Sequence, residues 1–418
     1  MKKSLISTLE TGHLTTAQVN DIQIALKAAQ RRFSAITEVE DRNGRSVLCM
    51  AVRFLISKGS FEAAITIADA RPKNPSLAEM RFLALRRLGD QHATDRAIDE
   101  LARTPGKSQR LEHVLFSEKL KNPHKLTADD HRRFGPIPRD FEEALRNLGD
   151  AESVDADQMQ VCEGLIAHIG LVGKEAEAYR ERFKWGIRSR EYISYVHRVQ
   201  RSIESRVSKN GDLTPKDRRL LRLGRQMRER VIAPDIAQTL QEPISQGRSI
   251  VLLQAHAGVN SFWQSLTSQT GLPEVFFAAN ARDASSSNRI RTSGGAEMAF
   301  AKLAKSIKKA AHLVRLYPDG LAGGDRVHAM VAGVDVTLGP GASVLAWYGN
   351  AATYFCETRW TTDLYLQHRL IPGPIADKNR DREQFEFELH GFYTQQLEKI
   401  AMESPESIYK GGVWNAFA

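Results

Sequence analysis

A histidine and an aspartate, each just behind a short apolar segment, are the residues of this chain best suited to acid–base chemistry. His256 follows the apolar run 250–253, and Asp319 follows the apolar run 312–317. A neutral imidazole can take up a proton near pH 7. Ligands of open α/β sheets bind at the carboxyl ends of the parallel strands. The sequence therefore makes His256 a candidate general base for a substrate hydroxyl; a structural role, which is the more common one for a lone histidine after a strand, is the alternative.

The residues after His256 bear on how its ring is held. Gly258 lets a substrate approach the backbone or permits the turn into a helix. Asn260 and Ser261 can fix the tautomer of the imidazole by a hydrogen bond, but neither carries a charge that would stabilise an imidazolium. Because the loops at the strand ends of one sheet converge, Asp319 is the nearest candidate for a carboxylate that does so.

The elements expected to position these residues alternate between strands and helices. We expect strands at 250–253, 272–277, 312–317, 334–337 and 353–358, and helices at 296–311, 343–348 and 385–402. This alternation is typical of an α/β domain whose central, mostly parallel sheet is flanked by helices. We assign this domain to residues 231–418.

The first 230 residues show helical periodicity, which predicts an all-α N-terminal domain over 1–230. Within about 45–105, Gly59 and Gly89 are separated by thirty residues, as are Pro75 and Pro105. This spacing resembles tetratricopeptide-type helix pairs, and a generic helical domain is the alternative. A turn-forming cluster at 208–215 is expected to act as a hinge.

The charge of the chain is concentrated in one segment. The formal net charge is +9, and residues 181–230 alone hold fifteen basic and six acidic side chains. Such a stripe suits a polyanionic partner: nucleic acid, an acidic carrier protein or anionic lipid headgroups; a solvated helical face is the alternative. Because no nucleic-acid-binding module accompanies the stripe, nucleic acid is the least expected of these partners.

Other classes of protein are disfavoured. No apolar run approaches the ~20 residues of a membrane-spanning helix, and the N-terminus lacks the apolar centre of a signal peptide. Cys49, Cys162 and Cys356 are far apart and lack metal-ligand spacing. We therefore expect a cytoplasmic protein without a disulfide framework, a metal or a bound cofactor.

Several motifs in the last 45% of the chain occur in a distinctive order. The segment 254–261, the arginine pair Arg289 and Arg291, the block 317–320, the glycine-rich entry 339–341 and the closing segment 387–414 follow one another. In this order they resemble the lipid A biosynthesis acyltransferases, the late lauroyl and myristoyl transferases, over about residues 232–418. That family has the lysophospholipid acyltransferase-like fold, so the resemblance implies this fold here.

The resemblance also implies a reaction and a set of residues. An acyl chain would pass from acyl carrier protein or coenzyme A to a hydroxyl or amine of a glycolipid or glycan, with His256 as the base. Arg289 and the backbone amides beside Gly258 would stabilise the oxyanion. A polar loop would bring Arg289 and Arg291 to a phosphate of donor or acceptor, although an ordinary loop is as good an interpretation. Pro318 and Gly320 would complete the substrate-binding residues.

The chain departs from the family at one position. The family motif places Asp or Glu five residues after the histidine, where this sequence has Ser261. The enzyme is then slow, or it uses another acid, such as Asp319, or the fold is a catalytically weakened or inactive scaffold that binds a lipid or carrier. The family also has an N-terminal membrane helix where this chain has a helical domain. Contact with an anionic inner-membrane surface, through residues 182–230, would therefore be peripheral; an acceptor that is not a membrane lipid is the alternative.

Overall fold

The computed structural model describes most of the chain. The described residues are 47–57, 60–69, 75–88, 91–102, 140–150, 156–208, 212–233, 236–267, 270–278, 289–291, 296–320, 326–377 and 381–418, with a few isolated positions. They form two compact units, Met1–Leu115 and Phe116–Ala418. No described helix is both long enough and apolar enough to cross a membrane.

The first unit is helical where it is described. Its helices are α3 (Val47–Ser57), α4 (Phe61–Asp69), α5 (Pro75–Leu88) and α6 (Gln91–Ala102). Small side chains such as Ala63 and Ala64 are buried between α3, α4 and α5, and a second core joins α5 to α6. Neighbouring helices of this unit thus share apolar cores. Gly59, Gly89 and Pro105, which carry the thirty-residue spacing, lie outside the described residues, so the resemblance to tetratricopeptide repeats stays a prediction.

The second unit contains helices that the sequence analysis placed in the N-terminal domain. These are α9 (Phe141–Arg146), α10 (Ala156–Ile169), α11 (Gly173–Val207) and α12 (Pro215–Glu229). Leu165 of α10 and Phe183 of α11 share one core with Val251 and Phe355 of the sheet. The compact unit therefore begins at Phe116 and not near residue 230, because the apolar faces of these helices are buried against the α/β part.

Two glycines permit this close packing. A Cβ atom at Gly164 would overlap the carbonyl oxygen of Phe417, and one at Gly186 would overlap that of Glu406. Helices α10 and α11 therefore lie directly against the backbone of the C-terminal tail. The tail includes the short 3₁₀ helices η6 (Pro405–Ser407) and η7 (Gly412–Phe417).

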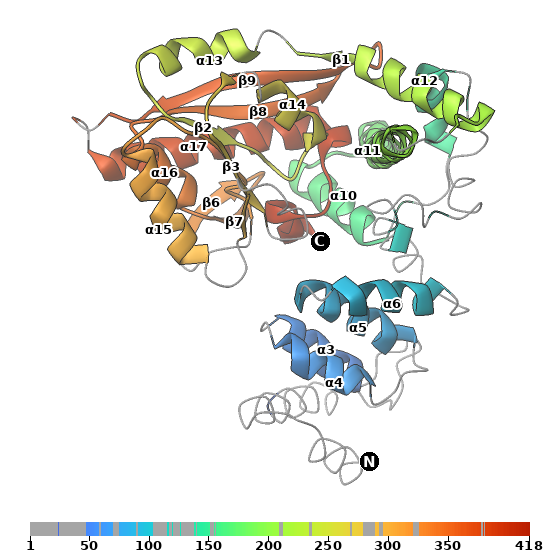
Figure 1. The fold of residues 1–418 in the computed structure, drawn as a ribbon. Coiled ribbons are helices and arrows are strands. Elements are labelled where there is room, and N and C mark those ends of the chain that lie inside the picture. Colours follow the sequence, from blue (N-terminus) through green and yellow to red (C-terminus); the bar gives the residue numbers. More distant parts are fainter. Residues whose placement is uncertain are drawn as a thin grey trace. The chain divides into compact units, whose positions relative to one another are not determined.

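A seven-stranded sheet lies at the centre of this unit (Figure 1), with the strand order β1-β9-β8-β2-β5-β3-β4 in the described residues. The strands are β1 (Val231–Ile232), β9 (Leu366–Ile375), β8 (Ala352–Trp360), β2 (Ile250–Leu253), β5 (Leu313–Leu316), β3 (Glu274–Ala278) and β4 (Arg289–Arg291). Strands β8, β2, β5, β3 and β4 are parallel, and β9 runs antiparallel to β8. The expected mostly parallel sheet is confirmed.

Helices cover both faces of this sheet (Figure 1). On one face, α13 (Ile236–Ser245) and α14 (Trp263–Thr267) bury Ile250 and Leu252 of β2. On the other face, Val251 and Leu253 of β2 pack with α15 (Ala296–Ile307), α16 (Gly341–Tyr348) and α17 (Arg382–Glu403). Because β2 is buried on both faces, it has the continuous apolar sequence of a central parallel strand.

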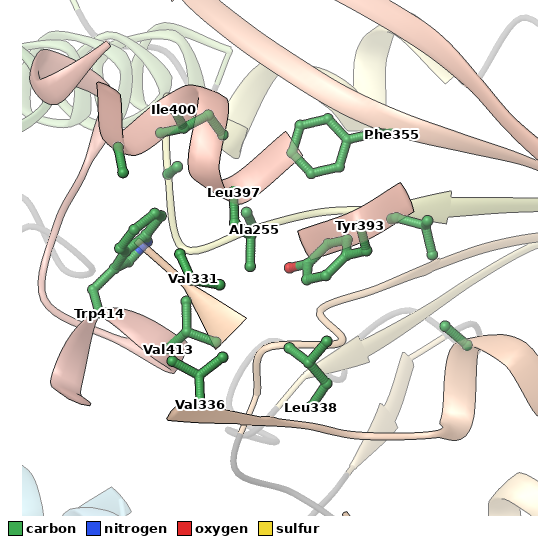
Figure 2. Close-up of a cluster of buried hydrophobic side chains, with 14 of the residues drawn as sticks. Ala255, Val331, Val336, Leu338, Phe355, Tyr393, Leu397, Ile400, Val413 and Trp414 are labelled. Atoms are coloured by element: carbon green, nitrogen blue, oxygen red, sulfur yellow. The ribbon is translucent and has the colours of Figure 1, made fainter. Parts of the chain in front are cut away.

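A hairpin and the C-terminal tail complete the core of the second unit. Strands β6 (Val327–Val331) and β7 (Val334–Leu338) form a separate antiparallel pair, joined by Ala332 and Gly333 with φ angles of 45° and 78°. Positive φ at both turn residues is the type I′ geometry of tight hairpins. Figure 2 shows Val331, Val336 and Leu338 of this hairpin near Trp414, Tyr393 and Ala255. Ala255, which immediately precedes His256, therefore anchors the His256 loop in this core.

Candidate active site

His256 and Asp319 come from adjacent parallel strands. Leu253 of β2 pairs with Leu316 of β5, and His256 and Asp319 each lie three residues beyond that pair. Asp319 Oδ2 accepts a hydrogen bond from the His256 backbone N–H at 2.9 Å and lies 3.0 Å from Nδ1 of the ring. One carboxylate oxygen thus fixes both the backbone and the ring of His256.

Of the two side chains in this pair, only that of His256 reaches solvent. The His256 side chain is 28% exposed, whereas that of Asp319 is 0% exposed. Burial lowers the pKa of His256, but the hydrogen bond and the negative charge of Asp319 outweigh it, so the pKa is raised above its ordinary value. A carboxylate only accepts hydrogen bonds, so Nδ1 carries the proton and Nε2 holds the free lone pair of the neutral ring. Among the described residues, Nε2 has no hydrogen-bond partner.

Two tyrosines and two glycines surround the imidazole. The ring of Tyr317 lies 5.0 Å and that of Tyr409 lies 5.9 Å from the His256 ring, centroid to centroid. A Cβ at Gly411 would lie 2.8 Å from His256 Cδ2, and one at Gly412 would overlap Asp319 Oδ2. The C-terminal tail therefore covers the side of the ring that faces Asp319. Sequence reasoning did not select Tyr409, Gly411 or Gly412, although the glycine pair marks a close backbone approach.

Asn260 holds the loop and does not contact the imidazole. Its Nδ2 donates to the carbonyl oxygens of Ala255 at 3.1 Å and Ala257 at 3.2 Å, on either side of His256. The expectation that Asn260 fixes the tautomer directly is therefore corrected, because Asp319 occupies that place. Ser261 lies in the 3₁₀ helix η3 (Asn260–Phe262), and its side chain is outside the described part of the structure.

Gly258 is required by the turn and by close packing. Its φ is +71°, and a Cβ there would lie 2.6 Å from Thr358 Cβ on β8. Its amide donates to the Ser407 carbonyl at 2.6 Å. This amide and that of His256 are thus already hydrogen-bonded. They are not available for the oxyanion-binding role expected of backbone amides around Gly258.

Pro318 and Gly320 shape the turn that carries Asp319. The Gly320 amide donates to Tyr317 O at 3.0 Å, and Pro318 O accepts from the Gly339 amide at 2.7 Å. Gly339 stands just ahead of α16. The turn is therefore attached at both ends, which holds the Asp319 carboxylate against the His256 loop.

Arg289 and Arg291 lie in a strand and not in the expected loop. They form β4, at the edge of the sheet, where Arg289 pairs with Phe276 of β3. Strands β5 and β3 separate β4 from β2. At about 4.8 Å per strand, the backbone of β4 is about 14 Å from that of β2. The side chains of both arginines are outside the described part of the structure.

Other candidate chemistries have less geometric support. Among the described residues, no group of three or more His, Cys, Asp or Glu side chains could hold a metal ion. Burial raises the pKa of the Cys356 thiol, and it raises that of Cys162 to about 12. Neither thiol is therefore activated as a nucleophile.

Part of the basic stripe is tied into the fold, and part is exposed. Arg182 pairs with Glu406 at 2.7 Å, Arg206 with Asp217 at 2.6 Å, and Arg188 is buried beside Glu191. The exposed cations of α12 have no carboxylate partner among the described residues; they are Lys216, Arg218, Arg219, Arg222, Arg225 and Arg228. The basic surface is thus the outer face of α12.

No protein-family model matches this chain, and no curated protein is significantly similar to it in sequence. The functional conclusion therefore depends on the geometry around His256 and on the order of the motifs that contain it.

Proposed function

We propose that the protein is an acyltransferase that moves an acyl chain from a thioester to a hydroxyl or amine, with His256 as the general base. The observation that carries the proposal is the 3.0 Å contact between His256 Nδ1 and Asp319 Oδ2 at the ends of two adjacent parallel strands. The order of motifs that resembles the lipid A acyltransferases supports the same reaction.

The proposed chemistry follows from the two ring nitrogens. Nε2 of His256 takes the proton of the acceptor hydroxyl or amine while Nδ1–H donates to Asp319. The acceptor oxygen or nitrogen then attacks the thioester carbonyl, and a tetrahedral oxyanion forms. When this intermediate collapses, the carbon–sulfur bond breaks, and the departing thiolate receives the proton from the imidazolium. The negative charge of Asp319 stabilises the imidazolium in between.

The resemblance supplies the proposed substrates. The donor is an acyl thioester of acyl carrier protein or coenzyme A, and the acceptor is a glycolipid or glycan. The exposed cations of α12 would attract an acidic carrier protein. A glycolipid acceptor would bring the protein to the cytoplasmic face of the inner membrane as a peripheral protein.

The alternative, an inactive scaffold that binds a lipid or carrier, is less well supported by the site geometry. It depended on the absence of a carboxylate five residues after His256, where Ser261 stands. Asp319 now lies within hydrogen-bond distance of the ring. We therefore favour an active enzyme whose acid comes from the neighbouring strand.

The experiment is an acyl-transfer assay with a labelled acyl carrier protein or acyl-coenzyme A and a cell extract as the source of acceptor. We expect the wild-type protein to release free thiol and to form a labelled acyl product. His256→Asn should abolish both, because the amide can still donate to Asp319 but cannot act as a base. His256→Ala is less suitable, because it would leave the fully buried Asp319 without its side-chain partner.

An exposed histidine–aspartate pair provides the matched control. His328 lies 3.2 Å from Asp335 on the β6–β7 hairpin, and both side chains are largely exposed. His328→Asn should leave transfer unchanged. Full transfer by His256→Asn would contradict the proposal.

A further inference from the structure

Arg190 of α11 lies beside the candidate active site, although it is outside the segment that resembles the acyltransferases. Its guanidinium carbon is 3.9 Å from the centroid of the Tyr409 ring, and that ring is 5.9 Å from the His256 ring. Since both distances are measured to the same Tyr409 ring centroid, the Arg190 guanidinium carbon is at most about 10 Å from the centre of the His256 imidazole. A cation from the helical part of the unit is thus within reach of a substrate bound at His256.

The packing of α11 determines this position. Arg182, Gly186 and Arg190 are spaced four residues apart and therefore share one face of the helix. Arg182 pairs with Glu406, and Gly186 packs directly against the Glu406 backbone. These contacts hold α11 against the tail that also carries Tyr409, so Arg190 is placed by the rigid body of the fold.

Arg190 differs from the neighbouring cations in having no ion pair with a described carboxylate. Arg182 pairs with Glu406, Arg188 lies 3.5 Å from Glu191, and Lys410 lies 3.1 Å from Asp157. Within the described part of the chain, no carboxylate is in ion-pair distance of Arg190, and its guanidinium lies over the Tyr409 ring. Burial lowers the pKa of Arg190, while Tyr409 and Glu191 act in the opposite direction. A half-buried guanidinium without a counter-ion is unfavourable unless a ligand supplies one.

We propose that Arg190 binds an anionic group of the acyl acceptor, a phosphate or a carboxylate, near the hydroxyl or amine that His256 deprotonates. The planar guanidinium donates two parallel hydrogen bonds to either group. The donor's phosphopantetheine phosphate fits less well, because it lies at the far end of that arm from the thioester. The assignment to the acceptor rests on the proposed function, whereas the anion site itself does not.

The test measures anion binding without turnover. The full-length protein is titrated with inorganic phosphate, and separately with acetate, at constant ionic strength, while the NMR signals of the His256 ring are followed. We expect saturable shifts for the wild-type protein with phosphate, acetate or both. The ion that binds more tightly shows whether the site prefers a phosphate or a carboxylate. Arg190→Gln should weaken that binding by at least about tenfold, because a hydrogen bond to a charged group is lost. Arg190→Lys should retain part of it.

Arg201→Gln is the matched control, because Arg201 is an exposed cation on the same helix and has no ion pair with a described residue. It should bind the anion as the wild type does. Equal binding by Arg190→Gln, or no saturable binding of either ion to the wild type, would overturn the inference. Anion binding through Arg190 in a protein that transfers no acyl group would contradict only the proposed function.

Discussion

Replacing Asp319 by asparagine removes one charge beneath the His256 ring and hardly changes the shape of the side chain. Asp319 Oδ2 accepts from both the backbone N–H and Nδ1 of His256, and the asparagine carbonyl can take the place of that oxygen. The amide NH₂ then occupies the position of Oδ1, which is buried and has no hydrogen-bond partner among the described residues. Burying these donors without partners should lower the free energy of unfolding by about 1–3 kcal/mol.

The same substitution should change the pH dependence of the reaction. Asp319 raises the pKa of His256, so the pKa falls in Asp319→Asn. Since the base must be neutral, the acidic limb of the rate profile should move to lower pH. The maximal rate should fall by about 10²–10⁴-fold, the range of general acid–base catalysis, because the imidazolium loses its counter-charge.

The stabilising effect of the pair should depend on pH in a defined direction. Because the folded pKa of His256 is raised, its ion pair stabilises the fold fully below the unfolded pKa of about 6.5. This contribution is lost as the pH rises through the higher folded pKa. The difference in unfolding free energy between wild type and Asp319→Asn should therefore be largest below pH ~6.5 and smaller in alkaline solution.

Denaturant titrations at several pH values and NMR titration of His256 provide the measurements. Asp335→Asn, in the exposed His328 pair, is the control and should change stability by less than about 1 kcal/mol. An unchanged His256 pKa in Asp319→Asn, or a stability difference that grows above neutral pH, would refute the reasoning.

Three further predictions concern packing and partners. Gly258→Ala should lower the free energy of unfolding by about 1–3 kcal/mol in denaturant titrations, because φ is +71° and the new Cβ would collide with Thr358. A loss below about 0.5 kcal/mol, which is the size of a surface substitution, would contradict this prediction. Gly186→Ala should lower the free energy of unfolding by at least about 2 kcal/mol, because α11 touches the tail backbone at this glycine. Gly391→Ala in α17 has open space around the new Cβ and should raise the free energy of unfolding by about 0.5–1 kcal/mol. Equal effects of the two substitutions would refute the close packing at Gly186. Reversing the charge of three exposed arginines of α12 should weaken binding to acyl carrier protein at low salt, as measured by titration calorimetry, and should leave the thermal midpoint nearly unchanged. Normal binding by this variant would show that the exposed face of α12 is only solvated and does not bind the carrier. The three substitutions are Arg218→Glu, Arg219→Glu and Arg222→Glu.

Strands with local signals could be predicted from the sequence. The apolar runs that became β2, β3, β5 and β8 were expected, because central parallel strands are continuously apolar. The run that became β7 was also expected as a strand, but β7 lies in the separate β6–β7 hairpin and not in the central sheet. Strand β9 was missed, since it contains Pro372 and Pro374, which argue against a strand. It is accommodated beside β8 with a register shift between Ala352 and Tyr354.

The site was predictable only where sequence position fixes geometry. His256 and Asp319 follow paired positions of neighbouring strands, so convergence of the strand ends brings them together. Arg190 and Tyr409 could not be found this way, because their contact joins residues more than 200 positions apart. The assignment of α10 and α11 to a separate domain failed for the same reason: helical periodicity shows that a face is buried, but not against what.

The pH dependence of acyl transfer, measured beside the titration of the His256 ring in the same protein, tests the central claim most directly. If His256 is the general base, the transfer rate should rise with the fraction of neutral imidazole, so the kinetic pKa of the free enzyme should equal the pKa of His256 obtained by NMR. Both should lie above the ordinary histidine value, because of Asp319. A transfer rate that stays constant while the His256 ring titrates would contradict the account.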